Sequence, residues 1–159
     1  MIEFDQPLQL ISNWKIYFSF RNGETMMTQP NKILIVDDDP IDLRRIQLIL
    51  QHGGYSVVTA ADGDEGLTIL HRQRVDLILA DVVMPNMDGY QFHETVRVNP
   101  RWDLIPFILI SGLLNPCHVQ AGKESGADDF LIKPLEGEML LSVVRGKLKR
   151  IEQLRDQLL

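Results

Sequence analysis

Polar side chains stand where the apolar runs of this chain come to an end. Asp37 and Asp38 follow the first run, Asp81 follows the third, Ser111 ends the fourth and Lys133 ends the fifth. An isolated carboxylate is costly to bury unless a cation pairs with it. Three clustered carboxylates would therefore need positive charge, which Lys133 and a hard divalent metal ion can supply. These residue types predict a metal site with a lysine beside it.

Five short apolar runs alternate with segments of helical periodicity, and these elements must position the polar side chains. Such alternation predicts βαβ units and a parallel sheet with helices on both faces. The expected strands are 32–36, 55–60, 76–80, 106–111 and 129–133, and the expected helices are 40–51, 62–72 or 64–72, 86–98, 115–126 and a fifth after residue 134. The predicted fold class is therefore α/β, a flavodoxin-like, doubly wound sheet of five parallel strands in the order 2-1-3-4-5.

Each polar strand end also has an ordinary structural explanation. Asp39 before Pro40 fits a helix N-cap, Ser111 before Gly112 fits a turn, and Lys133 fits a solvated lysine. Taken singly, these explanations are the better ones. In a doubly wound sheet, however, the carboxyl ends of the strands meet at one edge, which is where such folds bind ligands. The convergence of all these side chains at that edge favours a functional site.

Residues Asn31 to about Leu148 resemble the receiver domain of two-component response regulators. The resemblance rests on four motifs in the family's order, namely DDDP after the first strand, D-x-x-MPNMDG from Asp81, LISG at the fourth strand and GADDFLIKP at the fifth. It implies that Asp81 accepts a phosphoryl group. It also implies that Asp37 and Asp38 hold Mg²⁺, for which Mn²⁺ is expected to substitute.

The resemblance also implies roles for the other side chains of the site. An oxygen of Asp81 and the backbone carbonyl of Val83 would complete the protein ligands of the metal. Ser111 is similar to the family's hydroxyl switch residue, Lys133 to its phosphate-binding lysine and Phe130 to the aromatic residue that reorients. A cis peptide bond is implied between the lysine and the proline that follows it. This set of residues suits phosphoryl transfer, in which catalysis is mostly positioning and charge neutralisation.

The implied function is signalling rather than metabolic catalysis. A sensor histidine kinase or a histidine phosphotransfer protein would donate the phosphoryl group, and the domain would catalyse only its own phosphorylation and dephosphorylation. A conformational switch would then signal to a downstream protein target or a separate output protein. A phosphorylation-dependent homodimer through the fourth and fifth helices is a further expectation.

Composition narrows the expected partners. The chain has 159 residues, a formal net charge of -6 and a pI near 5.1. Because a phosphate backbone selects a basic surface, this acidic balance predicts no nucleic acid among the partners. No apolar run approaches the roughly 20 residues that a membrane span needs, which predicts no membrane partner and a cytoplasmic location. The single cysteine, Cys117, excludes an internal disulfide and, beside His118, lacks the spacing of a zinc site.

Three regions are expected along the chain. Residues 1–30 form an N-terminal extension, which is expected to be a loosely ordered arm or a stretch that is not translated in the natural protein. The second option arises because Met26 and Met27 lie just before the receiver-like segment and either could be the true translation start. Residues 31–148 form the receiver domain. Residues 149–159 extend the last helix beyond the family's usual end.

The main alternative is a haloacid-dehalogenase-like phosphatase with Asp37 as the nucleophile. Ser111, Lys133 and the pair Asp128–Asp129 would then supply the other catalytic groups. The order is wrong for that family, because its acidic pair follows its lysine, whereas here the pair precedes Lys133. The alternative also leaves the D-x-x-MPNMDG motif unexplained.

Two weaker alternatives remain. His93–Glu94 faintly resembles the phosphorylated histidine box of a histidine kinase, but no nucleotide-binding segment accompanies it. We therefore expect His93 on the surface of the third helix. A receiver-like scaffold that binds partners without phosphorylation is disfavoured by the intact acidic, hydroxyl and lysine positions.

Overall fold

The chain divides into two compact units, Met1–Pro30 and Asn31–Leu159. A computed structural model describes residues 17–21, 24–112, 120–121 and 124–158. In the first unit, β1 (Tyr17–Arg21) pairs with β2 (Glu24–Thr28) in an antiparallel hairpin. Nothing in the sequence of this segment predicted the hairpin, because its apolar residues follow no regular period.

The second unit is built on a five-stranded parallel sheet. The strands are β3 (Lys32–Val36), β4 (Ser56–Ala60), β5 (Leu77–Asp81), β6 (Phe107–Ser111) and β7 (Asp129–Ile132). They lie in the order β4-β3-β5-β6-β7, and each neighbouring pair is parallel. Counted from β3, this is the order 2-1-3-4-5, so the predicted flavodoxin-like topology is confirmed.

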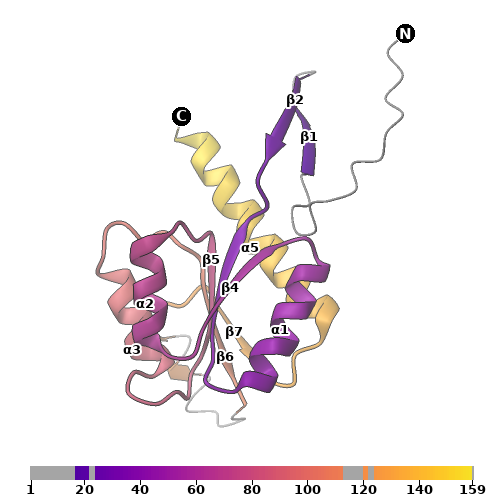
Figure 1. Cartoon of the computed structure of the whole chain (residues 1–159). Helices are drawn as coiled ribbons and strands as arrows, with labels where there is room; N and C mark the ends of the chain where they lie inside the picture. Colours follow the sequence, from indigo (N-terminus) through magenta and orange to yellow (C-terminus); the bar gives the residue numbers. More distant parts are fainter. Residues whose placement is uncertain (1–16, 22–23, 113–119, 122–123, 159) are drawn as a thin grey trace. The chain divides into compact units, whose positions relative to one another are not determined.

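Helices cover both faces of this sheet. The described helices are α1 (Pro40–His52), α2 (Gly63–Arg72), α3 (Gly89–Arg97) and α5 (Gly137–Gln157). Helices α1 and α5 lie on one face, and α2 and α3 lie on the other (Figure 1). The helix expected over 115–126 falls largely outside the described residues. Within the part of the chain that the structure describes, no helix is both long and apolar enough to cross a membrane.

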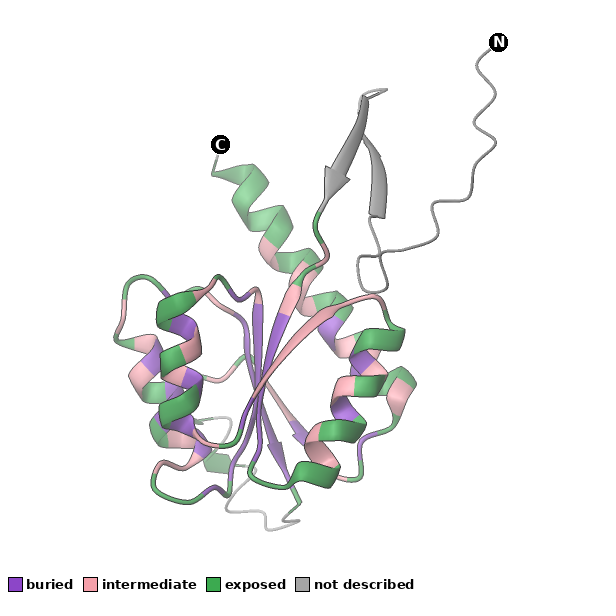
Figure 2. Cartoon of the chain, in the orientation of Figure 1, coloured by how far each residue is buried: buried purple, intermediate pink, exposed green. Residues whose placement is uncertain are grey.

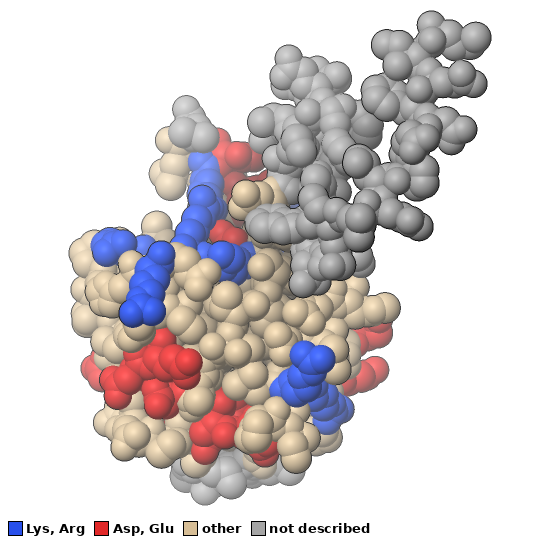
Figure 3. Space-filling view, in the orientation of Figure 1, with Lys and Arg blue, Asp and Glu red and all other residues tan. Residues whose placement is uncertain are grey.

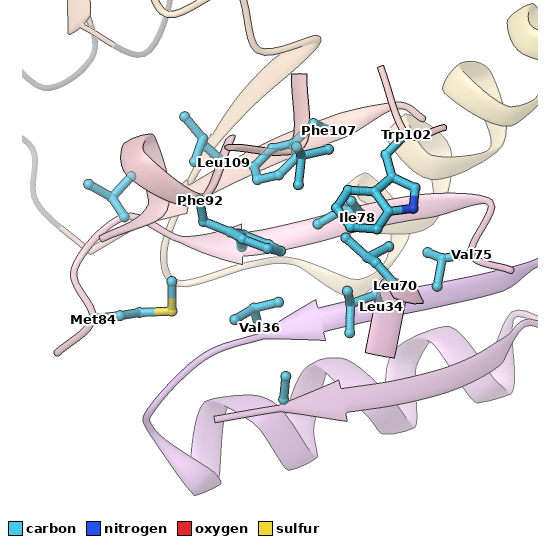
Figure 4. Packing of buried hydrophobic residues seen from close by; sticks show 14 residues of the cluster. Leu34, Val36, Leu70, Val75, Ile78, Met84, Phe92, Trp102, Phe107 and Leu109 are labelled. Carbon is cyan, nitrogen blue, oxygen red and sulfur yellow. The ribbon is translucent and has the colours of Figure 1, made fainter. Parts of the chain in front are cut away.

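Alternation along the strands divides the hydrophobic core into two. In β3, Ile33 and Ile35 pack toward α1 and α5, whereas Leu34 and Val36 pack toward α2 and α3. The central strands β3, β5 and β6 are almost fully buried, the edge strands β4 and β7 are mostly half-buried, and the helices expose their outer sides (Figure 2). Phe92 of α3 packs with residues of the sheet in the part of the core that lies under α2 and α3 (Figure 4). A strand covered on both sides must be apolar at every position, which explains its unbroken apolar sequence.

Aspartates cap the first two helices. The Asp39 side chain accepts a hydrogen bond of 2.8 Å from the Ile41 backbone N–H at the start of α1. Asp62 does the same for Glu65 at the start of α2, also at 2.8 Å. Both bonds satisfy backbone donors that the first turn of a helix leaves unpaired. The helix-cap explanation of Asp39 is therefore confirmed, and the third aspartate of the DDD run stabilises the fold.

Helix α3 begins later than expected, at Gly89 instead of Asn86. Asp88 is the N-cap, and its side chain and that of Gln91 each accept a backbone hydrogen bond from the other residue. This reciprocal capping box fixes the start of the helix. Asn86 stands before it with a φ of 66°, a left-handed conformation that cannot belong to an α-helix. The turn signal of the MPNMDG motif therefore outweighs the helical pattern there.

The expectation that His93 lies on the surface is wrong. The residue is only 3% exposed, and its ring packs edge-on against Phe107 with centroids 4.8 Å apart. Among the described residues its Nε2 atom has no hydrogen-bond partner. Burial, together with the nearby Arg97 charge, lowers the pKa of His93, although Asp128 opposes this shift. The imidazole is therefore a neutral part of the core.

A buried neutral histidine makes folding stability depend on pH. Because the folded pKa is lowered, the unfolded chain binds the proton more strongly, so stability is lost as the pH falls through about 6.5. We expect the free energy of unfolding of His93→Leu to fall less steeply below that pH, by up to about 1.4 kcal/mol per pH unit. Urea unfolding between pH 7 and 5 measures this, and exposed His52→Gln is the control. Equal slopes for wild type and His93→Leu would contradict the expectation.

Candidate functional site

The polar strand ends converge at the carboxyl edge of the sheet. Asp37 follows β3 and its backbone N–H continues the pairing with β4 by donating to Ala60. Asp81 and Ser111 are the last residues of β5 and β6, and Lys133 follows β7. Acidic side chains gather toward this edge, over the lower part of the face in Figure 3. The sheet thus brings together side chains that are distant in the sequence.

The ammonium group of Lys133 joins three carboxylates. Its Nζ atom lies 2.9 Å from Asp37 Oδ2, 2.8 Å from Asp42 Oδ2 and 3.0 Å from Asp81 Oδ2. A lysine ammonium has three N–H donors, so these contacts occupy all of them. The lysine is thereby held in one position between β3, α1 and β5.

Burial and the ion pairs act together on these charges. Burial raises the pKa of Asp37, and the hydrogen bond from Lys133 offsets this rise only in part. For Lys133, burial alone would lower the pKa, but the bonds to Asp42, Asp37 and Asp81 outweigh it and raise the pKa well above its usual value. The lysine therefore stays charged at physiological pH, and the site keeps one fixed cation.

Asp37, Asp38 and Asp81 form a group that can hold a metal ion. One carboxylate oxygen from each lies within 4.8 Å of the others. Asp37 and Asp81 are buried and Asp38 is exposed, so the cluster is open on one side. The Val83 backbone lies beside it, because its N–H donates to Asp81 Oδ1 at 3.2 Å. Carboxylate and carbonyl oxygens are the ligands that hard divalent cations prefer, so these residues fit such an ion.

Ser111 and Phe130 lie on the strands next to the cluster. Ser111 is completely buried, and its carbonyl accepts a hydrogen bond of 2.8 Å from the Lys133 backbone N–H. Phe130, in β7, is half-buried against the core on the α2 and α3 side. The peptide bond between Lys133 and Pro134 is cis, as the resemblance implied. The backbone hydrogen bond between Lys133 and Ser111 places Lys133 directly beside the end of β6.

Asp42 is a member of the site that the sequence analysis missed. It lies in the first turn of α1, where an acidic residue is common because it complements the helix dipole. This ordinary explanation hid its contact with Lys133. The one available signal was its spacing from the DDD run, which places it over the carboxyl edge of the sheet once α1 is known to start at Pro40.

The geometry disfavours the acidic pair of the dehalogenase alternative. The Asp128 carboxylate accepts from the Phe107 backbone at 2.7 Å and pairs with Arg97 at 2.8 Å. Phe107 begins β6, so Asp128 lies at the opposite edge of the sheet from Asp37. Asp129 pairs with Lys147 of α5. Neither carboxylate joins the cluster.

Comparison with known proteins agrees with this arrangement. The family model of the response regulator receiver domain matches residues 33–145. The chain belongs to the response regulator receiver family. Solved receiver structures share its fold at substantial identity. The signal receiver domain of a signal transduction histidine kinase from Syntrophus aciditrophicus has a TM-score of 0.71 and 38% identity, covering 75% of this chain and 90% of that one. The chemotaxis protein CheY4 of Vibrio cholerae has a TM-score of 0.69 and 36% identity, covering 73% and 97%.

Curated relatives include transcriptional regulators. The transcriptional regulatory protein AfsQ1 of Streptomyces coelicolor is 40% identical over 124 residues, which is 78% of this chain and 53% of AfsQ1. The DNA-binding response regulator MtrA of Mycolicibacterium smegmatis is 32% identical over 127 residues, 80% of this chain and 54% of MtrA. The chain thus spans about half the length of these relatives.

The prediction that nucleic acid has no part among the partners is contradicted by these relatives. They are named as transcriptional regulators, and MtrA as DNA-binding. The prediction rested on the net charge of this chain. The net charge of a receiver describes only the surface of the receiver itself. It does not predict whether the receiver acts on a separate region that binds DNA.

Gly89 allows α3 to start directly beside the end of β5. Its N–H donates to the Val82 carbonyl at 2.8 Å, and a Cβ added at Gly89 would collide with the Asp81 carbonyl oxygen. The obstructing atoms belong to the backbone and cannot rotate away. A residue with a side chain would therefore push α3 away from the end of β5.

We expect Gly89→Ala to destabilise the receiver by about 2 kcal/mol, because overpacking against fixed backbone forces a shift. The control is Gly146→Ala in α5, where an added Cβ meets no atom within 4 Å. Alanine favours a helix interior, so this change should stabilise by about 0.5–1 kcal/mol. Chemical unfolding measures the free energy of unfolding of both variants. An unchanged value for Gly89→Ala would show that α3 can shift to accommodate the added Cβ, and would contradict the expectation.

Lys133 also has a measurable effect on folding. Lys133→Met keeps the apolar stem but leaves the buried Asp37 carboxylate without its cation, and removing one partner of a buried pair is costly. We expect a loss of about 2–3 kcal/mol at pH 7, and a smaller loss in acid where the carboxylates are protonated. Lys147→Met, which breaks a more exposed pair with Asp129, should cost at most about 1 kcal/mol. Equal losses in the two variants, measured by urea unfolding, would contradict this account.

Proposed function

We propose that this receiver takes a phosphoryl group onto Asp81 from a phosphohistidine of a sensor kinase or phosphotransfer protein, and passes a signal on by a conformational switch. The supporting observation is the Lys133 ammonium, which lies 3.0 Å from Asp81 and 2.9 Å from Asp37. It gives a nucleophilic carboxylate a fixed positive charge at the point where a dianionic group would arrive. The proposed function is signalling, with no turnover of a separate substrate.

The transfer forms one bond and breaks one bond. An oxygen of the Asp81 carboxylate attacks phosphorus, the bond from phosphorus to the donor nitrogen breaks, and the nitrogen keeps the electron pair. Lys133 compensates the charge of the transferred group. Asp37, Asp38, Asp81 and the Val83 carbonyl would hold Mg²⁺ or Mn²⁺. When bound, this ion neutralises phosphoryl oxygens, which catalysis of phosphoryl transfer requires.

Ser111 and Phe130 are proposed to carry the signal away from Asp81. A phosphoryl group offers strong acceptors, so the Ser111 hydroxyl would turn toward it. Ser111 and Phe130 stand on the neighbouring strands β6 and β7. A shift of Ser111 would therefore free space for the half-buried Phe130 ring to turn inward, changing the surface around β7 and α5.

The relatives suggest where this signal goes. Because AfsQ1 and MtrA are named as regulators of transcription or as DNA-binding, we extend the proposal to an output that acts on DNA. The receiver would control a DNA-binding region or a DNA-binding partner through its switched surface. The acidic charge of the receiver is no obstacle to this output, since the contact with DNA would be made elsewhere.

Identification of the modified aspartate tests the proposal. We expect acetyl phosphate to place one phosphoryl group on Asp81 in the presence of Mg²⁺, and almost none in EDTA, because clustered carboxylates repel an incoming phosphate. Borohydride trapping and peptide mapping locate the label. Asp81→Asn should abolish it, whereas Asp103→Asn, which changes an exposed aspartate away from the cluster, should not.

Two results would contradict the assignment. Recovery of the label at Asp37 with steady turnover of phosphate monoesters would favour the dehalogenase alternative, since its covalent intermediate must hydrolyse quickly for the enzyme to cycle. Persistent labelling of Asp81→Asn at the wild-type rate would show that another group accepts the phosphoryl group.

A further inference from the structure

Asp42 differs from the other two carboxylates that bind Lys133. It comes from the first turn of α1 and is not part of the carboxylate group that can hold a metal. Its side chain is 33% exposed, compared with 2% for Asp37 and 11% for Asp81. Nevertheless its contact with the Lys133 ammonium, at 2.8 Å, is as short as theirs.

A phosphoryl group on Asp81, with its larger charge, competes with the present partners of Lys133 for the ammonium group. All three N–H groups of the ammonium are taken. Release of Asp37 would strand a buried carboxylate without its cation, which is costly. Release of Asp42 returns a partly exposed carboxylate to water, and pairs of that kind contribute little net energy. The N–H that now bonds Asp81 can follow the phosphoryl group, and of the two other partners Asp42 is the one that Lys133 releases at the lower cost.

We propose that Asp42 is a resting-state counter-ion that occupies Lys133 in the unphosphorylated receiver and gives way when Asp81 carries a phosphoryl group. The inference rests on the proposed function and adds a regulatory element to it. Asp42 acts through Lys133 as a positioning residue, because it touches neither the metal ligands nor Asp81 in any contact that the structure describes.

The exchange has a quantitative consequence. A group that binds only when Lys133 is free has its affinity multiplied by the fraction of receivers in which the lysine is free. Asp42→Asn keeps the shape of the side chain and removes its charge, so the held fraction falls. Asp42 thus lowers the affinity of the site for a phosphoryl group and favours the unphosphorylated state.

Beryllium fluoride, which forms a phosphoryl-like adduct with carboxylates, is the probe. In saturating Mg²⁺, we expect Asp42→Asn to bind it about fivefold more tightly than wild type. The matched control is Asp64→Asn, which removes another exposed carboxylate from a helix first turn, that of α2. Its affinity should equal that of wild type. Unfolding curves of both variants separate this effect from any change in stability.

A double-mutant cycle tests whether the effect passes through Lys133. Asp42→Asn should speed labelling by acetyl phosphate, followed by mass spectrometry, but should not speed it in a Lys133→Ala background. Equal acceleration in both backgrounds, or tighter beryllium fluoride binding by Asp64→Asn as well, would mean that diffuse charge repulsion is responsible, and would overturn the inference. Unchanged affinity of Asp42→Asn would also overturn it. Failure of the wild-type receiver to bind the probe or accept label would instead contradict the proposed function.

Discussion

The contact between the Lys133 ammonium and the carboxylates of Asp37 and Asp81 is the interaction on which the site depends. It connects the ends of three strands, β3, β5 and β7, that are separated by long stretches of sequence. Without a cation, the desolvated carboxylates would repel one another and resist burial. The sheet topology brings the groups to one edge, and the ion pairs make their proximity tolerable. The single lysine thus explains why buried carboxylates stand at the ends of β3 and β5.

Much of the second unit could be predicted from the sequence, because its signals are local and consistent. The central strands are nearly unbroken apolar runs since both of their faces are covered, and Pro40 and Asp62 mark helix starts through fixed dihedrals and side-chain caps. The residues proposed for phosphoryl transfer could be named because each ends a strand. The rule that strand ends share an edge then places them together before any contact is known.

The features that escaped prediction depend on contacts with no local sequence signature. The burial of His93 depends on how α3 packs against Phe107 of β6, and the sequence pattern of the helix did not reveal it. Asp42 was hidden by an ordinary role in a helix first turn. The start of α3 moved because a capping box competed with helical periodicity. The inference about nucleic acid failed for another reason, since net charge describes one surface and a signalling domain acts through others.

The division of the core by the sheet has a consequence for how such a domain can diversify. Ile33 and Ile35 serve the α1 and α5 side, while Leu34 and Val36 serve the α2 and α3 side, so neighbouring residues belong to different packing units. Substitutions on one side need compensation only on that side. The outer surfaces of the two helix pairs can consequently diverge under selection by different partners, while the backbone between them, and the cluster of charged groups at its carboxyl edge, stays the same.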